Sequence, residues 1–378
     1  MIIGIDASRA FIQKRTGTEN YSRHLIFWLT KLDRINQYRL YLKNRQRIDF
    51  GLPPNFQVVR IPLPRLWTQA GLAVRSFLDP LDVLFIPAHT LPIIRRPGLK
   101  TVVTIHGLES EYLPEHYQWP QKLFLNCSTH YAVKKADQLI AVSAWTRDQL
   151  VARLGANPKK IKVIYEGVEE AKFRIPDSKF QIERVKRKYQ LERDYVLFVG
   201  TIQPRKNLVR LIQAFGKFSE QTSRLFSLVL VGKPGWQYDK IYATPAQLGI
   251  AGRVKFLGHV PQKDLVALYR GAGVFCLPSL MEGFGLPVLE AMAAGVPVIA
   301  GQAGALPEVV SRAGLLVNPE KVEEIAAALE LILKNRTLRQ ALKKKGLKRA
   351  KKLSWQKTAQ KTLELIQSLE SKTIRSTG

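Results

Sequence analysis

The feature that most constrains the fold of this chain is an alternation of short apolar runs with amphipathic stretches, which occurs twice along the sequence. Apolar runs rich in Val, Ile and Leu are typical of strands buried on both faces, and the stretches between them have helical spacing. We expect strands at 2–6, 38–42, 57–61, 83–86, 101–105, 138–142 and 162–165, and again at 195–199, 227–231, 254–257, 274–277 and 297–299. Helices are expected at 18–33, 119–135, 143–153, 206–218, 262–271, 287–295 and 321–335.

This alternation predicts an α/β fold with two doubly wound, Rossmann-like domains that face a cleft. A chain of 378 residues is also too long for one ordinary core. We place the first domain at 1–168, a linker with the start of the second domain at 169–193, and the second domain at 194–353. A C-terminal helix at 354–378 can cross back to the first domain. Ligands of doubly wound sheets bind at the carboxyl ends of the strands, so functional residues are expected in the loops there.

The composition is that of a globular protein, with 46% hydrophobic residues. No apolar run approaches the roughly 18 residues needed to cross a bilayer. The first residues, MIIGIDAS, begin directly with a strand pattern, so we expect no signal peptide and a cytoplasmic location. Cys127 and Cys276 lie far apart in apolar contexts, and we expect both to be small buried residues in a reducing compartment.

The net charge of +29 needs a partner or a cause. It is spread almost evenly over the two halves, with one concentration at 331–353, where ten Lys and Arg occur without an acid. A solvated helix face on a generally basic protein is one interpretation, and attraction to an anionic membrane surface or to pyrophosphate substrates is another. Nucleic acid is a third, but the sequence has no signature of a nucleic-acid module, so we expect no such partner.

The strongest functional signal is the segment EGFGLPVLE, which runs from Glu282 to Glu290. It follows an apolar run and opens a helix, so the backbone N–H groups of Phe284, Gly285 and Leu286 would suit a diphosphate. Two carboxylates beside a diphosphate would repel it, and we therefore expect Glu282 and Glu290 to bind sugar and ribose hydroxyls. The alternative is a helix cap followed by one solvated glutamate.

A pair of cations follows the first strand of the second domain. Arg205 and Lys206 stand where a loop turns into a helix, and there they can clamp a departing diphosphate. The alternative, surface charge at a helix start, is disfavoured by the helix dipole. The sequence has no D-x-D, H-E-x-x-H or C-x-x-C motif, so we expect no metal and assign charge neutralisation to these cations.

The first domain contributes weaker signals. Gly17 stands near the start of the first helix and can approach the same diphosphate, or it is a plain loop glycine. His106 ends the strand TVVTIH and can contact the transferred sugar, although a lone histidine is more often structural. Glu109 and Glu111 follow it and either contact the acceptor or are solvated.

In order and spacing, these segments resemble glycosyltransferase family 4, whose members are retaining enzymes with the two-domain GT-B architecture. The resemblance covers nearly the whole chain. It is carried by T-G-T-E-N-Y, T-I-H-G, G-T-I-Q-P-R-K-N-L, L-P-S-L-M-E-G-F-G-L-P-V-L-E-A-M-A-A-G-V-P-V-I-A and G-A-L-P-E-V-V followed by G-L-L-V. The resemblance assigns acceptor binding to the first domain and nucleotide-sugar binding to the second.

For the donor, the resemblance implies that Glu282 binds the hydroxyls of the sugar and Glu290 holds the ribose. Arg205 and Lys206 match the pair that binds the diphosphate.

The resemblance implies further that the amides of Phe284, Gly285 and Leu286 form the backbone site for the diphosphate, and that His106 lies near the C6 hydroxyl of the sugar. Val260 matches the position that holds the base. Gly17 matches the glycine loop of the N-terminal domain.

The chain departs from the family pattern at two places. Many members have a Gly-Gly pair where this chain has Gly17-Thr18, which puts closure of that loop in doubt. Many also read N-G-V-D where this chain has Glu166-Gly167-Val168-Glu169, which puts the hinge contacts in doubt.

The stretch E-S-E-Y-x-P-E after His106 resembles members that build bacterial surface polysaccharides, often with GDP-mannose. We therefore expect a hexosyltransferase without a cofactor that uses a nucleotide-diphosphate sugar, with GDP-mannose favoured. The expected acceptor is a saccharide, free or linked to polyprenyl pyrophosphate, at the inner face of the membrane. The apolar and basic stretch 61–78 would bind the anionic surface there.

Two rival hypotheses remain open. A nucleotide-sugar 2-epimerase on the same fold would use the same cleft and release free sugar. A basic nucleic-acid-binding protein would explain the charge but not the paired glutamates. For the transferase, we expect front-face substitution through an oxocarbenium-like transition state, because no enzymic nucleophile is evident on the opposite face.

Overall fold

The computed structural model describes residues 1–12, 17–108, 119–173, 178–191, 194–222 and 225–370. The chain forms two compact units, and each is described by itself. The N-terminal unit ends at Glu166 and takes back the chain from Trp355 onward, and the C-terminal unit contains Gly167–Ser354. The sequence had placed these crossings at 168 and 354. The C-terminal unit begins at Gly167, so the stretch 169–193, expected as a linker, falls within that unit.

The N-terminal unit is built on a seven-stranded sheet of order β3-β2-β1-β4-β5-β6-β7, and all its pairings are parallel. The strands are β1 (Ile2–Asp6), β2 (Gln37–Lys43), β3 (Phe56–Ile61), β4 (Val83–Ile86), β5 (Lys100–Ile105), β6 (Gln138–Ala141) and β7 (Ile161–Val163). The strand order reverses between β1 and β4. Such a reversal opens a crevice at the carboxyl ends of the two strands.

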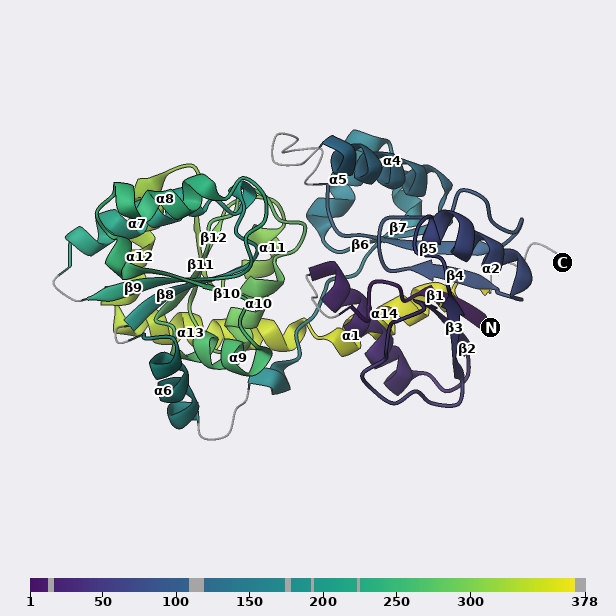
Figure 1. The fold of residues 1–378 in the computed structure, drawn as a ribbon, viewed down its shortest axis with the longest axis horizontal. Coiled ribbons are helices and arrows are strands. Elements are labelled where there is room, and N and C mark those ends of the chain that lie inside the picture. The colour runs from purple at the N-terminus through teal and green to yellow at the C-terminus, as the bar shows by residue number, and fades with distance from the viewer. Residues whose placement is uncertain (13–16, 109–118, 174–177, 192–193, 223–224, 371–378) are drawn as a thin grey trace. The chain divides into compact units, whose positions relative to one another are not determined.

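The helices of this unit are α1 (Gly17–Leu32), the π-helix η1 (Trp67–Leu72), α2 (Ala73–Leu78), α4 (Trp119–Lys135), α5 (Ala144–Leu154), η3 (Pro158–Lys160) and α14 (Trp355–Gln367). The last of these packs against α1 (Figure 1). Trp67, Leu72, Ala132 and Leu150 share one buried cluster, which joins η1, α4 and α5 to the sheet. Helix α14 therefore belongs to the N-terminal unit, although the chain has passed through the whole C-terminal unit between Glu166 and Trp355.

The C-terminal unit is built on a six-stranded parallel sheet of order β10-β9-β8-β11-β12-β13. The strands are β8 (Asp194–Val199), β9 (Phe226–Val231), β10 (Val254–Gly258), β11 (Val274–Leu277), β12 (Val298–Gly301) and β13 (Leu315–Val317). All residues of β9, β11 and β12 are buried, as expected for strands covered on both faces, whereas the edge strands β10 and β13 are mostly partly buried. Here the order reverses between β8 and β11.

The helices of the C-terminal unit are η4 (Glu170–Phe173), α6 (Ser178–Lys188), η5 (Pro204–Lys206), α7 (Leu208–Glu220), α8 (Asp239–Gln247), η6 (Ala251–Arg253), α9 (Gln262–Gly271), α10 (Leu286–Ala293), α11 (Leu306–Val310), α12 (Val322–Lys334) and α13 (Arg336–Lys352). In Figure 1, α7, α8 and α12 lie on one side of the sheet, and α9, α10 and α13 lie on the other. The apolar positions of α13, Leu342, Gly346 and Ala350, are buried, and this helix packs against α10. Its basic residues lie mostly on the exposed side.

The α/β class with two parallel, Rossmann-like sheets is confirmed. The expected strands all occur, and each bound agrees with the predicted one to within two residues. One cysteine prediction is wrong. Cys276 is buried in β11, but Cys127 is exposed, because it lies on the outer face of α4.

Among the described residues, no helix is both long enough and apolar enough to span a bilayer.

Candidate active site

The candidate donor site lies in the C-terminal unit, at the point where the strand order reverses. β8 and β11 are hydrogen-bonded neighbours there, although three α-helices, two short 3₁₀ helices and two strands of the described chain separate them in sequence. The loop after β8 carries Arg205 and Lys206 in η5, and the loop after β11 carries Glu282. The parallel sheet therefore brings the two strongest sequence signals to one place.

Glu282 forms ion pairs with both predicted diphosphate ligands. Lys206 Nζ lies 2.5 Å from Glu282 Oε1, and Arg205 Nη1 lies 3.0 Å from Glu282 Oε2. Arg205 Nη1 also donates to the carbonyl oxygen of Met281. The side chains of all three charged residues are about nine-tenths buried. The residues expected to bind sugar and diphosphate thus hold one another in place.

Hydrogen bonds from backbone and side-chain groups fix the two loops against each other. Leu280 N donates to Arg205 O at 3.0 Å, and Asn207 Nδ2 donates to Pro278 O at 3.1 Å. Ser279 Oγ donates to Glu282 Oε1 at 2.7 Å. The charged groups are therefore preorganised, which is the arrangement that electrostatic catalysis requires.

A third loop, after β12, supports Glu282 from behind. Ala305 N donates to Glu282 O at 2.9 Å. Gly304 has φ of 59°, and a Cβ there would lie 2.5 Å from Glu282 O and 2.7 Å from Glu282 N. Only glycine permits this backbone conformation and this close approach together.

The electrostatic state of Glu282 is set by its two cations. Burial alone would raise the pKa of this carboxyl, but Lys206 and Arg205 outweigh burial and lower the pKa to about 2. Glu282 is therefore ionised at neutral pH. A carboxylate can accept hydrogen bonds from sugar hydroxyls without first losing a proton.

The helix that follows Glu282 begins as the sequence indicated. Gly285 is the N-cap of α10 with φ of 100°, and Leu286 is the first helical residue, before Pro287. Phe284 is 4% exposed, and Gly285 is buried as well. The amides of Gly285 and Leu286 thus belong to a helix start beside Glu282, with the orientation that favours an anion.

Glu290 lies one turn into α10 and is partly buried. Burial raises its pKa to about 7, although a hydrogen bond from Tyr269 and the charge of Lys172 act against the rise. Tyr269 OH donates to Glu290 Oε2 at 2.9 Å. The pKa values of Glu282 and Glu290, eight residues apart, are therefore shifted in opposite directions. Glu282 is ionised, and Glu290 can take up a proton near neutral pH.

Val260, the predicted base-binding position, is buried just after β10. β10 is separated from β8 by β9 alone, so Val260 belongs to the same edge of the sheet as Arg205 and Glu282. The distance from β10 to β8 across the sheet is about 9.6 Å, since strands are about 4.8 Å apart. This span suits a nucleotide whose base lies beyond its diphosphate.

His106, in the N-terminal unit, has a protein partner on each ring nitrogen. Nε2 lies 2.9 Å from the carbonyl oxygen of Pro87, and Nδ1 lies 3.0 Å from Glu166 Oε1. Tyr21 packs edge-on against the imidazole with ring centroids 4.7 Å apart. The sequence did not predict this engagement. For His106 to hydrogen-bond a sugar, one of its protein contacts must be exchanged.

The partners of His106 also indicate where its protons lie. A carbonyl oxygen only accepts, so Nε2 of His106 carries a proton and donates to Pro87 O. His89 Nε2 accepts from the backbone N–H of His106 at 3.3 Å, so its proton lies on Nδ1 near Thr129 Oγ1. Burial lowers the pKa of His89 to about 3, which agrees with a neutral ring there.

Glu166 is therefore a candidate functional residue, whereas the sequence reading treated it only as a departure from the family pattern. Its side chain is 6% exposed, and it is the last residue before the chain passes into the C-terminal unit. Nothing local to residue 166 signals a partner 60 positions earlier, so only the fold reveals the pair.

Gly17 is the first residue of α1 and is exposed. A Cβ at this position would meet no atom within 4 Å, so no contact within the N-terminal unit requires a glycine. Glu109 and Glu111 lie outside the described residues. The cleft expected between the two domains, with a role for Gly17 in it, stays a prediction.

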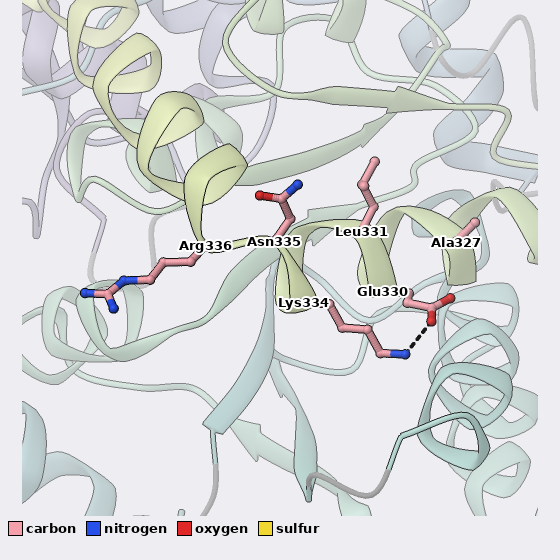
Figure 2. A pocket seen from close by; sticks show the side chains of 6 residues that line it. All are labelled: Ala327, Glu330, Leu331, Lys334, Asn335 and Arg336. Carbon is pink, nitrogen blue, oxygen red and sulfur yellow. Dashed lines mark hydrogen bonds and ion pairs between the residues drawn. The ribbon is translucent and has the colours of Figure 1, made fainter.

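A surface pocket of about 500 Å³ lies elsewhere in the C-terminal unit, where α12 ends and α13 begins (Figure 2). It is lined by Ala327, Glu330, Leu331, Lys334, Asn335 and Arg336. Because α12 starts beyond the carboxyl end of β13 and runs back along the sheet, its last turn lies at the opposite edge from Glu282. Lys334 pairs with Glu330 at 2.5 Å, and we assign this pocket no role in the chemistry.

In the described part of the chain, no three His, Cys, Asp or Glu side chains come together in a way that could hold a metal ion.

Comparisons with known families cover both units. Residues 17–172 match the family model described as "Glycosyltransferase Family 4", and residues 179–349 match the one described as "Glycosyl transferases group 1". The O-antigen chain mannosyltransferase B of Escherichia coli is 33% identical over 271 residues, which are 71% of this chain and 71% of that protein. The serotype-specific mannosyltransferase WbdA of Escherichia coli is 29% identical over 74% of this chain, but the match spans only 34% of that longer protein.

Solved structures share the fold. Sucrose-phosphate synthase from Thermosynechococcus elongatus superimposes with a TM-score of 0.79 at 21% identity, covering 98% of this chain and 99% of that one. The Anabaena protein HepE in complex with UDP-glucose gives a TM-score of 0.73 at 19% identity, covering 97% and 99%. At these identities the likeness concerns the architecture.

Proposed function

The chain belongs to glycosyltransferase family 4 and is a hexosyltransferase, and from this premise we propose that it moves mannose from GDP-mannose to a growing cell-surface polysaccharide with retention of the anomeric configuration. The acceptor in this proposal is a saccharide, free or linked to polyprenyl pyrophosphate. The observation that carries the proposal is the buried triad of Glu282, Arg205 and Lys206 at the strand-order reversal.

The triad supports transfer because different residues serve the two tasks of a donor site, which are to bind the diphosphate and to bind the sugar. Arg205 and Lys206 supply two positive charges where a diphosphate would leave, and the amides that open α10 add a helix N-terminus. The ionised Glu282 supplies acceptors for sugar hydroxyls. On binding, the diphosphate would take over part of the coordination that Glu282 now gives the two cations.

In the reaction that we propose, the bond from the anomeric carbon to the diphosphate breaks while the acceptor hydroxyl attacks from the same face. The leaving phosphate accepts the proton of that hydroxyl. Charge develops on the diphosphate in an oxocarbenium-like transition state, and Arg205 and Lys206 stabilise it. We propose that these cations take the place of a metal ion and that the protein uses no cofactor.

The choice of mannose rests on the relatives. Two mannosyltransferases of Escherichia coli, one of them named for the O-antigen chain, align with more than 70% of this chain. The structural neighbour HepE binds UDP-glucose, so the shared architecture also accommodates another base and sugar. The similarity to these mannosyltransferases therefore favours mannose as the sugar, and in the donor that we propose, GDP-mannose, the base is guanine.

A panel of nucleotides tests the donor. GDP and GDP-mannose should raise the unfolding temperature by mass action, and UDP, UDP-glucose and ADP should raise it less. A larger shift with UDP-glucose would overturn the donor assignment.

A product assay separates the transferase from its rivals. With GDP-mannose and a mannose-containing acceptor, the proposal predicts a longer saccharide whose new linkage has the α configuration of the donor. Free 2-epimerised sugar without an acceptor would indicate the epimerase. Binding of DNA with no response to any donor would indicate the nucleic-acid alternative.

The proposal also places the enzyme at the inner face of the cell membrane, where a polyprenyl-linked acceptor would be. The net charge of +29 supports this location, because polybasic surfaces are attracted to anionic lipids.

A further inference from the structure

Exposed apolar side chains are concentrated in one part of the N-terminal unit. Eleven large apolar side chains in the described residues are at least 48% exposed, and six of them come from 66–94. These six form the apolar patch: Leu66, Val74, Phe77, Leu78, Ile93 and Ile94. Soluble monomers expose single apolar residues routinely, but a group from one short stretch indicates an interaction surface.

Hydrogen bonds hold the two segments of the patch together. Gln69 Nε2 donates to Leu91 O at 3.2 Å, and Ile93 N donates to Gln69 Oε1 at 2.9 Å. Arg96 N donates to Ser76 Oγ at 3.3 Å, on the buried side of α2. The loop after β4 is therefore fastened along η1 and α2, so the apolar side chains of both segments belong to one surface.

The exposed residues of α2 lie on one face of that helix. Val74, Phe77 and Leu78 have the i, i+3, i+4 spacing of a single stripe, whereas Ala73 and Ser76 are buried against the unit. Their exposed fractions are 55%, 48% and 67%. A short helix with its polar and small residues inside and its large apolar residues outside is the reverse of an ordinary surface helix.

Leu66, which belongs to the patch, has an unusual backbone conformation. It has φ of 52° and ψ of 26°, a left-handed conformation that is costly for a leucine, and its side chain is 74% exposed. Its carbonyl accepts from Ala70 N at 2.8 Å, which begins η1. Glycine or asparagine would adopt this conformation at lower cost. The chain has instead a large apolar side chain at a strained and exposed corner.

The charges around the patch are positive. Arg65 is exposed, and Arg95 and Arg96 donate to backbone carbonyls, including Lys135 O at 3.0 Å and Asp79 O at 3.3 Å. A carbonyl carries no net charge, so these contacts leave the two positive charges in place.

The acids of this region do not offset those cations. Asp79 is buried and already pairs with Arg39 and Arg75. The other acid between 61 and 100 is Asp82, which accepts from Ile2 N.

The positive charge around the patch decides between two partners, a second copy of this chain and an anionic lipid bilayer. In a two-fold dimer the same patch would face itself and bring the three arginines of each copy together, which repels. Anionic headgroups attract the arginines, and the acyl region takes up the apolar side chains. We propose that the apolar patch, with Arg65, Arg95 and Arg96, is a docking surface for an anionic lipid bilayer. The purpose of this docking rests on the proposed function, but lipid binding is measurable without it.

Vesicle flotation of the full chain tests the surface. The wild type should float with vesicles of phosphatidylcholine and phosphatidylglycerol, and weakly with phosphatidylcholine alone. The double variant Phe77→Ser/Leu78→Ser should lose at least tenfold in partitioning, because two large apolar groups no longer enter the membrane. Arg65→Gln should weaken binding to anionic vesicles only, and more at low than at high salt.

A matched control is available in the same unit. Ile35 is 86% exposed but lies outside the patch, so Ile35→Ser should partition like the wild type. All variants should keep the wild-type unfolding temperature and GDP affinity, because the patch lies outside the donor site.

Three results would overturn the proposal: equal flotation of the double variant and the wild type, equal loss in Ile35→Ser, or a dimer that the double variant abolishes. Donor binding by the wild type is measured in parallel. A failure of lipid docking is thus distinguishable from a failure of the transferase assignment.

Discussion

The charged residues of the candidate donor site are held chiefly by one another. Glu282 accepts from Lys206, Arg205 and Ser279, and all of these contacts are within 3.0 Å. Removing one partner of a buried ion pair typically costs about 3–5 kcal/mol, because the other charge loses its compensation. Substitutions in the triad therefore change stability as well as turnover, and both must be measured.

The low pKa of Glu282 predicts a pH-dependent contribution to stability. Its pKa falls from 4.5 to about 2 on folding, so its contribution is fully present above pH 4.5 and is lost as the pH falls toward 2. The full effect is on the order of 3 kcal/mol. Urea unfolding of the wild type and of Glu282→Gln should show a stability difference that shrinks between pH 5 and pH 2.5. A difference that does not change with pH would contradict the ion triad, and the surface variant Glu330→Gln serves as the control.

Glu290 predicts a pH dependence of the opposite kind. Burial raises its pKa to about 7, so the free protein binds a proton there below neutral pH. If the ionised form accepts the ribose hydroxyls, nucleotide affinity should rise from pH 5.5 to about 7.5 and then level off. The rise should approach tenfold per pH unit at the acid end. Titration calorimetry checks this, and Glu290→Gln should bind more weakly with a flat profile. A wild-type profile as flat as that of the variant would exclude the role.

At the scale of elements, three loops after β8, β11 and β12 build the donor site, and each is fixed by backbone contacts. The sequence predicted the first two from their charges and glycines. It contained the third loop only as the motif G-A-L-P-E-V-V and gave it no role, because the role of Gly304 depends on a contact with Glu282 that the parallel pairing of β11 and β12 creates.

Two glycines with the same backbone handedness test that loop. Gly304→Ala would place a Cβ 2.5 Å from Glu282 O, whereas Gly249→Ala, with φ of 68°, would meet no atom within 4 Å. Both should lose about 1–2 kcal/mol from backbone strain. Only Gly304→Ala should also lower transfer, by 100-fold or more, because Glu282 must move. Comparable activity of the two variants in steady-state assays would show that the loop is not a support for the site.

Several elements that the sequence analysis missed each have a physical reason. β13 has three residues, too few to show a pattern. α8 contains Pro245, and a proline inside a helix weakens its sequence signal. α2 carries large apolar residues on its exposed face, so its pattern does not resemble that of a surface helix.

At the scale of the whole molecule, the α/β class and the two sheets followed from the alternation of apolar runs, since strands buried on both faces leave a strong signal. The donor-site residues followed from motif order, because the carboxyl ends of neighbouring strands must meet. What the sequence could not supply were partners from distant segments, such as Glu166 for His106 and Tyr269 for Glu290. The C-terminal helix is a larger example. The sequence indicated that it can return to the N-terminal unit, and its packing against α1 shows that it does.

The central claim is that Lys206 binds the diphosphate of a donor whose sugar is bound by Glu282. Calorimetric titration of GDP and GDP-mannose into the wild type, Lys206→Ala and Glu282→Gln at pH 8 tests it most directly. Lys206→Ala should weaken both ligands by roughly 100-fold, the loss of a buried charge-assisted contact. Glu282→Gln should bind GDP at least as tightly as the wild type, because the cations are released, and should lose the extra affinity that the mannose provides. Unchanged GDP affinity in Lys206→Ala, or an unchanged ratio of the two ligands in Glu282→Gln, would contradict the account.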